Sequence, residues 1–311
     1  MKTQNLILGL MVFFFVSCSF VFAQPFETIQ IGDGTQKFTT PVWSPDGRKL
    51  ALRDSKDQAI FVADAEGKGG IEKITSPCAP LVWIDNNRLL VAKVERLKLG
   101  KKLVFIRTMK IVSLRGEEEI LDRGHNLSAP IRLNDGTVGY FFNERGGFNK
   151  LSDGQLGGMA LKQSRVFCKY KETNTDIWLE SLDKSVLRKL FTMNGACYSP
   201  LISPDETKIV VAWKDSLFVL SLDGEILGGT DYGDSPAWSP DSKHIAYAKT
   251  EDDGHRITKS ELYTIDADGT NKVRITDTPE EVELHPTWSP DGTKIACWSD
   301  NTGKIFVIKL K

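Results

Sequence analysis

The histidines are the first candidates for a functional role, because their side chains bind transition metals and transfer protons near neutral pH. The sequence has four histidines, His125, His244, His255 and His285. Three or more of them around one axis would hold a metal suited to a lyase or a hydrolase. His244 follows a turn and His255 lies in an insertion, so we expect no metal site. His125 and His285, which come shortly before recurring prolines, are the two candidates if one exists.

Other catalytic patterns are missing from the sequence. There is no Gly-x-Ser-x-Gly nucleophile elbow and no glycine-rich phosphate loop that leads into a helix. Residues 266–271, Asp-Ala-Asp-Gly-Thr-Asn, lack the glycine and glutamate spacing of a calcium loop, and are read as a hairpin turn. A carboxylate pair for glycoside hydrolysis stays open, because spacing in sequence does not report distance in space. We therefore expect no cofactor and no enzymatic activity.

A recurring phrase, Pro-x-Trp-Ser-Pro-Asp, defines the elements that must position these side chains. It occurs at residues 41–46, 236–241 and 286–291, and weaker copies start at positions 80, 130 and 200. Proline fixes φ, aspartate bonds to nearby backbone and a following glycine accepts positive φ, so each copy predicts two strands joined by a tight turn. Because the tryptophan recurs in step with the turn, we interpret it as packing between units and not as a sugar platform. The framework residues are Trp43, Pro45, Asp46, Trp83, Pro204, Asp205, Trp238, Pro240, Asp241, Trp288, Pro290 and Asp291.

The spacing of the copies predicts an all-β protein, a β-propeller of four-stranded blades, since such blades repeat every 40–45 residues or so. Strand-like residues 165–191 add a unit that has lost its turn phrase, which favours seven blades; six blades with one enlarged unit is the alternative. Two insertions, residues 95–102 and 251–260, predict longer hairpins. The strand at residues 28–31 has no partner nearby, and we expect it to complete the last blade and close the ring.

Residues 1–23 predict a signal peptide, with Lys2, an apolar run and a small-residue site before Gln24. We expect a single domain over residues 24–311, periplasmic or secreted, with no transmembrane span in the mature chain; a lipid anchor at Cys18 is the alternative. In the repeat frame, Cys78 and Cys197 precede the openings of units that are not neighbours. Cys168 and Cys297 fall within the second strands of two further units, which are not neighbours of each other either. Since neither pair comes from adjacent units, we expect free thiols.

The phrase resembles the repeat of the TolB-like propeller family, which also occurs in the propeller of prolyl oligopeptidase relatives. Ile74-Thr75, Ile275-Thr276, Asp231 and Asp277-Thr278-Pro279 are similar to the closing strand and linker of that repeat. The resemblance implies the fold over most of the chain. The resemblance implies neither the role of TolB nor the activity of the peptidases, because we expect no counterpart here of the N-terminal α/β domain of TolB or of the hydrolase domain of the peptidases.

Composition narrows the function further. With 40 Lys and Arg against 41 Asp and Glu, the chain lacks the basic excess of a nucleic-acid binder. We expect a non-catalytic, monomeric binding or scaffold module of the bacterial cell envelope that engages a protein or peptide through one mouth of the ring. The alternative is a polysaccharide lyase or hydrolase, of the oligogalacturonide type, with its site at the central channel.

Overall fold

The computed structural model describes residues 26–75, 80–133, 135–142, 147–152, 155–158, 164–181, 186–213 and 216–310. These residues form strands and connecting loops and contain no helix, which confirms the all-β prediction. The predicted signal peptide, Cys18 and Cys78 lie outside the described residues. Within the described part of the chain, no helical segment has the length and apolarity needed to cross a membrane.

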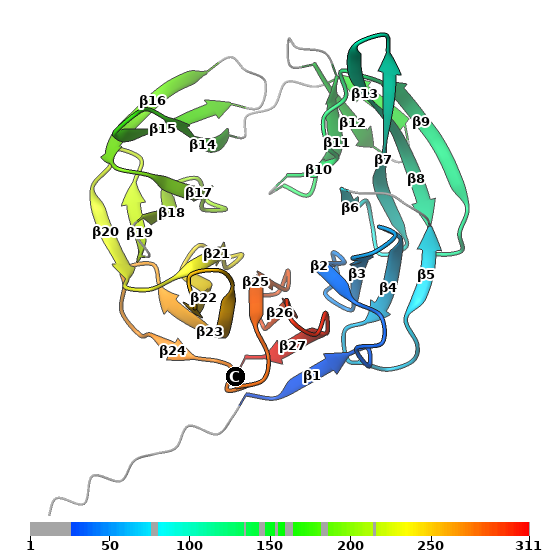
Figure 1. Cartoon of the computed structure of the whole chain (residues 1–311). Coiled ribbons are helices and arrows are strands. Elements are labelled where there is room, and N and C mark those ends of the chain that lie inside the picture. Colours follow the sequence, from blue (N-terminus) through cyan, green and yellow to red (C-terminus); the bar gives the residue numbers. More distant parts are fainter. Residues whose placement is uncertain are drawn as a thin grey trace, which may run out of the picture.

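The described strands assemble into seven antiparallel sheets, which Figure 1 shows arranged around a common centre. Six sheets have four strands and one has three. Five of the four-stranded sheets use strands that are consecutive in sequence. They contain β2 (Phe38–Trp43), β3 (Lys49–Asp54), β4 (Ile60–Asp64) and β5 (Glu72–Thr75); β6 (Leu81–Trp83), β7 (Arg88–Leu99), β8 (Lys102–Ser113) and β9 (Glu118–Gly124); β10 (Ile131–Arg132), β11 (Val138–Phe142), β12 (Gly147–Ser152) and β13 (Gln155–Gly158); β17 (Cys197–Ile202), β18 (Lys208–Trp213), β19 (Ser216–Ser221) and β20 (Ile226–Thr230); and β21 (Asp234–Trp238), β22 (His244–Asp252), β23 (Ile257–Asp266) and β24 (Val273–Arg274).

The two remaining sheets depart from that plan. One combines both ends of the described chain, because β1 (Thr28–Ile31) pairs with β27 (Ile305–Lys309), next to β26 (Lys294–Ser299) and β25 (Glu283–Trp288). In this pairing Ile29 lies opposite Val307. The other is the three-stranded sheet of β14 (Ser164–Tyr170), β15 (Asn174–Ser181) and β16 (Leu187–Asn194).

The Ser-Pro-Asp turns are held by side-chain hydrogen bonds. In the last copy, the Ser289 hydroxyl donates to Asp291 Oδ1 at 2.6 Å and accepts the Lys294 amide hydrogen at 2.9 Å. Asp291 Oδ1 also accepts from the Thr293 amide at 3.0 Å. Gly292 has a φ of 70°, which a glycine adopts at no steric cost. The Ser44–Asp46, Ser203–Asp205 and Ser239–Asp241 pairs repeat the hydroxyl-to-carboxylate bond.

In four of the repeats, the tryptophan that precedes the turn contacts the neighbouring sheet. Its indole N–H donates to a backbone carbonyl on the innermost strand of that sheet, at 2.9–3.1 Å in four copies. We call each of these bonds an indole staple. The four staples are Trp43 to Thr287, Trp83 to Val42, Trp238 to Leu201 and Trp288 to Ala237.

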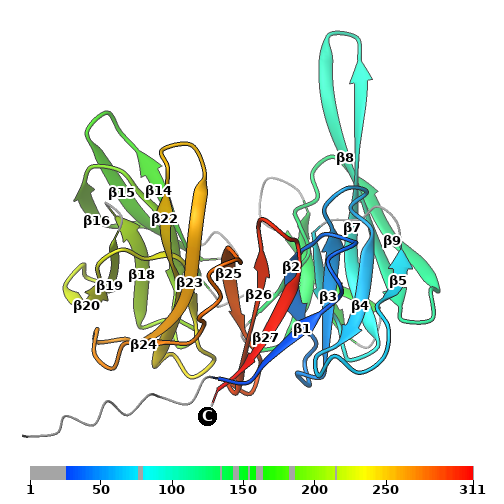
Figure 2. The same ribbon diagram turned by 60° about the horizontal axis from the view of Figure 1, so that its bottom comes forward.

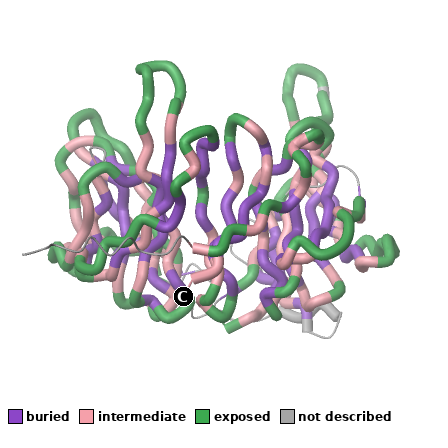
Figure 3. Tube along the Cα trace, turned by 90° about the horizontal axis from the view of Figure 1, so that it is seen from below, coloured by how far each residue is buried: buried purple, intermediate pink, exposed green. Residues whose placement is uncertain are grey.

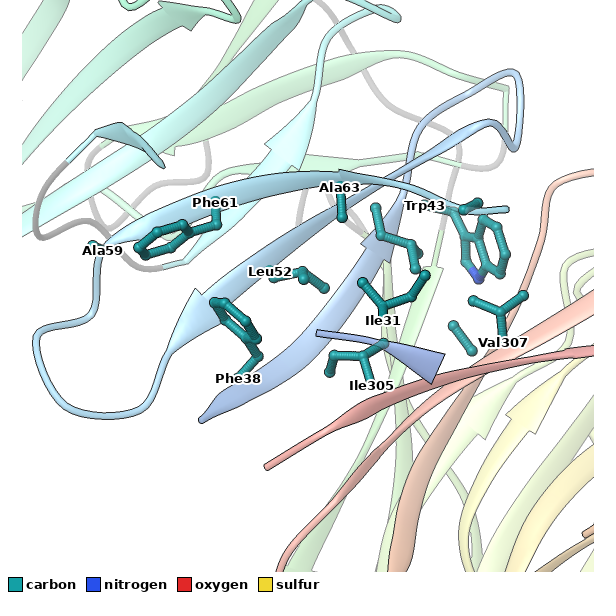
Figure 4. Close-up of a cluster of buried hydrophobic side chains, with 12 residues drawn as sticks. Ile31, Phe38, Trp43, Leu52, Ala59, Phe61, Ala63, Ile305 and Val307 are labelled. Carbon is teal, nitrogen blue, oxygen red and sulfur yellow. The ribbon is translucent and has the colours of Figure 1, made fainter. Parts of the chain in front are cut away.

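Apolar clusters fill the spaces between neighbouring sheets. Figure 4 shows one of them, in which Trp43 and Phe38 of β2 face Ile305 and Val307 of β27. The buried residues follow the middle of the strands, and the exposed residues gather in the loops at either end (Figure 3). Loops at the two ends are therefore the places where function can vary while the framework is kept.

Candidate functional site

The innermost strands of four sheets share a bulge with an unusual backbone. Directly before the opening proline, a residue other than glycine has a φ of 48–51°, at Thr40, Ser199, Ser235 and His285. Strand pairing shifts register at each of these points. A residue that has a Cβ is strained at positive φ. The bulge therefore changes the direction of a side chain in each of the four sheets, and each change costs conformational energy. Strain of this kind clusters at binding sites.

These bulges lie on the side of the molecule toward which the long hairpins project. The β7–β8 and β22–β23 hairpins extend the same way in Figure 2. Asp234 at the start of β21 pairs with Ala248, toward the hairpin end of β22, whereas Trp238 beside the turn pairs with Ile245. We call this end the hairpin side. The Ser-Pro-Asp turns occupy the opposite end, the turn side.

A pocket of 490 Å³ opens on the hairpin side between the β17–β20 and β21–β24 sheets. Two tyrosines stand at it with much of their surface exposed, Tyr198 at 42% and Tyr232 at 64%. Gly233 lies between Tyr232 and β21, and a Cβ there would come within 2.8 Å of the Leu217 side chain. The lining residues are Tyr198, Tyr232, Gly233, Asp234, Lys249, Thr250, Glu251 and Asp252.

The charge of this pocket is acidic. Its lining carries three carboxylates, on Asp234, Glu251 and Asp252, against the single ammonium group of Lys249. Asp234 also accepts a hydrogen bond at 2.5 Å from the backbone N–H of Ser235, the strained residue next to it. Exposed phenol rings beside carboxylates suit a ligand with apolar and cationic groups. Sequence reasoning missed this pocket, although Tyr198 and Asp234 each lie two residues before a recurring proline.

A second pocket, of 580 Å³, lies on the turn side between the β21–β24 sheet and the sheet of β25–β27 and β1. Trp288, Phe26 and Leu310 give it an apolar wall, and the His244 ring meets Trp288 edge to face at 6.3 Å. Two turn carboxylates line it, and both are already engaged by the hydroxyls of their own turns. We therefore assign this pocket to the framework.

The two candidate metal ligands lie in different sheets. His285 is on β25, where its exposed ring stacks on Trp298 with the ring centres 5.9 Å apart and nearly parallel. His125 is exposed and follows β9, the edge strand of the β6–β9 sheet. In the described part of the chain, no three His, Cys, Asp or Glu side chains are grouped so that they could hold a metal ion.

The cysteines require a correction. Cys168 lies on β14, the first described strand of its sheet and not the second. That shift brings it to the neighbouring β17, where its Sγ lies 3.5 Å from Cys197 Sγ. Cys297 is fully buried on β26. The prediction that Cys168 lies in a second strand is therefore wrong, and Cys168, Cys197 and Cys297 are free cysteines in this structure.

Buried carboxylates mark the start of β25. Glu283 is 1% exposed, and it accepts hydrogen bonds from the Thr278 and Thr276 hydroxyls. Burial raises the pKa of Glu283 to about 7, and the nearby Glu261 adds to the rise. Glu261 is itself paired with Arg274 at 2.6 Å. These groups join the loop after β24 to the framework, so we assign them to structure.

Comparison with known proteins identifies the class. No family model matches the chain, and no curated protein does. Solved structures do match. An oligogalacturonate lyase in complex with manganese has a TM-score of 0.56 at 15% identity, over 93% of this chain and 97% of that one. An oligogalacturonate lyase from Vibrio parahaemolyticus has 0.57 at 11%, over 93% and 98%.

A third match comes from outside the lyases. The β-propeller domain of Swd1 from Myceliophteria thermophila has a TM-score of 0.56 at 13% identity, over 92% of this chain and all (100%) of that domain. At such identities the likeness shows the fold alone. With the sheets arranged around one centre, it defines the class of this chain as an all-β protein of the β-propeller type.

Proposed function

We propose that this chain is an exported, non-catalytic binding module of the bacterial cell envelope. Its ligand is a peptide or a protein segment that enters the pocket between Tyr198 and Tyr232 on the hairpin side. The strained bulge beside that pocket carries the proposal, because Ser199 and Ser235 hold costly conformations next to two exposed tyrosines. The single domain spans residues 24–311 and acts in the periplasm or as a secreted protein.

The framework in this proposal has seven blades with TolB-like repeats. In this proposal each described sheet is one blade, and the pairing of β1 with β27 supports closure of the ring. A ring of this kind holds its mouth rigidly, which lowers the entropy cost of binding. Rigid support suits recognition by a few fixed side chains.

The pocket chemistry selects the ligand. Phenol rings give large contact areas at small conformational cost, and they pair with arginine or lysine through their faces. The excess of carboxylates over Lys249 favours a cationic segment. We therefore propose that the bound segment carries arginine or lysine next to an apolar residue.

The test is capture followed by quantitative binding. The mature chain is immobilised, envelope extract is passed over it, and retained proteins are identified by mass spectrometry. Synthetic segments of those proteins are then titrated by fluorescence anisotropy. We expect Tyr232→Ala to weaken binding about tenfold or more. Ile226→Ala is the matched control, since Ile226 on β20 has the same exposed fraction, 64%.

Two results would overturn the proposal. One is capture of no protein above the level of a blank column. The other is equal loss of affinity in Tyr232→Ala and the Ile226 control. Metal analysis of the purified chain and a screen on polyuronides belong to the same study, because bound metal with product formation would favour the lyase alternative.

A further inference from the structure

Where the three-stranded sheet meets the β17–β20 sheet, the described residues make no indole staple. In the β17–β20 sheet, the position of the recurring tryptophan is taken by Ile202, which has no N–H to donate across to the three-stranded sheet. On the other side of the same sheet, Trp238 makes its bond to Leu201. Across the junction with the three-stranded sheet, Trp213 of β18 donates its indole N–H to the Asn194 carbonyl at 2.7 Å, and β14 lies beside β17.

Two sulfur atoms face each other at that junction. Cys168 Sγ lies 3.5 Å from Cys197 Sγ, although the residues are 29 positions apart and in different sheets. Thr175 fixes the second cysteine: its hydroxyl donates to the Gly195 carbonyl at 2.8 Å and accepts from the Cys197 amide at 3.3 Å. A disulfide bond measures about 2.05 Å, so the two sulfurs must approach each other by about 1.5 Å to form it.

We propose that Cys168 and Cys197 form a reversible disulfide that joins β14 to β17. The site takes its oxidising equivalents from a small-molecule disulfide or from a protein disulfide. This inference rests on the sulfur geometry, and it holds whether or not the tyrosine pocket binds a peptide.

The reaction is thiol–disulfide exchange in two steps. The partly exposed Cys168 thiolate attacks the incoming disulfide, which forms a mixed disulfide and releases one thiolate. The buried Cys197 thiolate then attacks Cys168 Sγ, and the second thiol leaves. The protein loses two electrons and two protons, which the incoming disulfide gains as two thiols.

The order of these steps follows from the surroundings of the two sulfurs. The hydrogen bond with Cys197 raises the pKa of Cys168, and burial raises it further. The same hydrogen bond lowers the pKa of Cys197, with help from Thr175 and against the effect of burial. The pKa values alone would favour Cys197 as the thiolate, so the order is determined by access: a reagent can reach the partly exposed Cys168, whereas Cys197 is buried.

The experiment uses the mature chain incubated with oxidised glutathione and then alkylated. Trypsin cuts after Arg165, Lys169, Lys189 and Lys208, so residues 166–169 and 190–208 are released as separate peptides. We expect these two peptides joined, with the mass of two hydrogen atoms lost. We also expect a melting temperature about 5 °C above that of the reduced chain, from loop closure. Dithiothreitol should reverse both.

Variants assign the effect to the pair. Cys168→Ser and Cys197→Ala should each abolish the melting shift, and Cys297→Ser should keep it. The proposal fails if both peptides remain fully alkylated after oxidation, or if the link joins either of them to the Cys78 peptide, residues 74–88. The peptide map of the wild-type chain shows whether Cys168 and Cys197 are linked even if a variant fails to fold.

Discussion

The guanidinium of Arg132 donates to the backbone carbonyl of Trp83 at 2.9 Å, across the junction between two sheets. Arg132 stands two residues after Pro130, the place that tryptophan holds after Pro41, Pro236 and Pro286. The same group also reaches the Ile84 carbonyl at 3.2 Å. A repeat that has lost its indole therefore keeps the hydrogen bond to the neighbouring sheet. In the four tryptophan repeats and the Arg132 repeat, the bond between sheets, and not the aromatic ring itself, is the shared feature of this position.

Trp83 tests how much an indole staple contributes. Its side chain is 1% exposed, so Trp83→Ala removes buried apolar surface and the bond to Val42. We expect a loss of about 3–5 kcal/mol in the free energy of unfolding. Trp83→Phe keeps most of the surface and should lose about 1–2 kcal/mol. Urea denaturation followed by circular dichroism measures both, and no loss in the Phe variant would rule out a contribution from the bond.

Arg132 tests whether another donor can replace the indole. Arg132→Met should cost about 1 kcal/mol, because two carbonyls lose a partner. Arg132→Trp should recover part of that loss by restoring the repeat. Calorimetry of the two variants, with the exposed Arg115→Met as control, gives the comparison. A control shift as large as that of Arg132→Met would contradict a role for the bond.

Glu283 makes stability depend on pH near neutrality. Its folded-state pKa is raised from 4.5 to about 7, so the folded chain binds the extra proton between those values. Stability from this group is therefore highest below about pH 4.5, falls as the pH rises to about 7, and is constant above. The difference amounts to about 3 kcal/mol. Glu283→Gln should reduce the fall in stability between pH 4.5 and about 7 and raise the melting temperature at pH 8.

Glu281 is the matched control for that measurement. Burial raises its pKa, but hydrogen bonds from Thr302, Ser299 and Lys304 prevail and hold the pKa below its usual value. Glu281→Gln should therefore destabilise the chain at pH 8, opposite to the effect at Glu283. If both variants shift the melting temperature in the same direction at pH 8, the assignment of the two carboxylates is wrong.

One turn aspartate, Asp205, makes stability depend on pH in the acid range. Burial opposes ionisation of Asp205, yet hydrogen bonds from Ser203 and Thr207 lower its pKa to about 2. Its contribution is present above about pH 4 and is lost as the pH falls through about 2. Solvent exposure of the carboxylate limits it to about 1 kcal/mol. Asp205→Asn should lessen the fall in melting temperature between pH 4 and 2.5, whereas the exposed Asp231→Asn should leave it unchanged.

The strand–turn framework could be predicted from the sequence because short-range contacts determine it. Pro290, Asp291 and Gly292 determine a turn through contacts with residues that are near in sequence, so the pattern could be read from one chain. The tyrosine pocket was out of reach, since Tyr198 and Lys249 meet only after two sheets pack. The sulfur pair was missed for a related reason: the unit that contains Cys168 has lost the phrase that fixes the strand order.

The pairing of β1 with β27 has a consequence for how the chain is made. Ile29 is among the first described residues to leave the ribosome, and its partner Val307 is among the last. The β25–β27 sheet cannot gain its fourth strand until synthesis is almost complete. Until then the hydrogen-bonding edge of β1 has no partner strand, and an unpaired edge can pair with other chains. A chain truncated before Ile305 should therefore leave β1 permanently unpaired, and the demand for chaperone protection falls on the whole period of elongation.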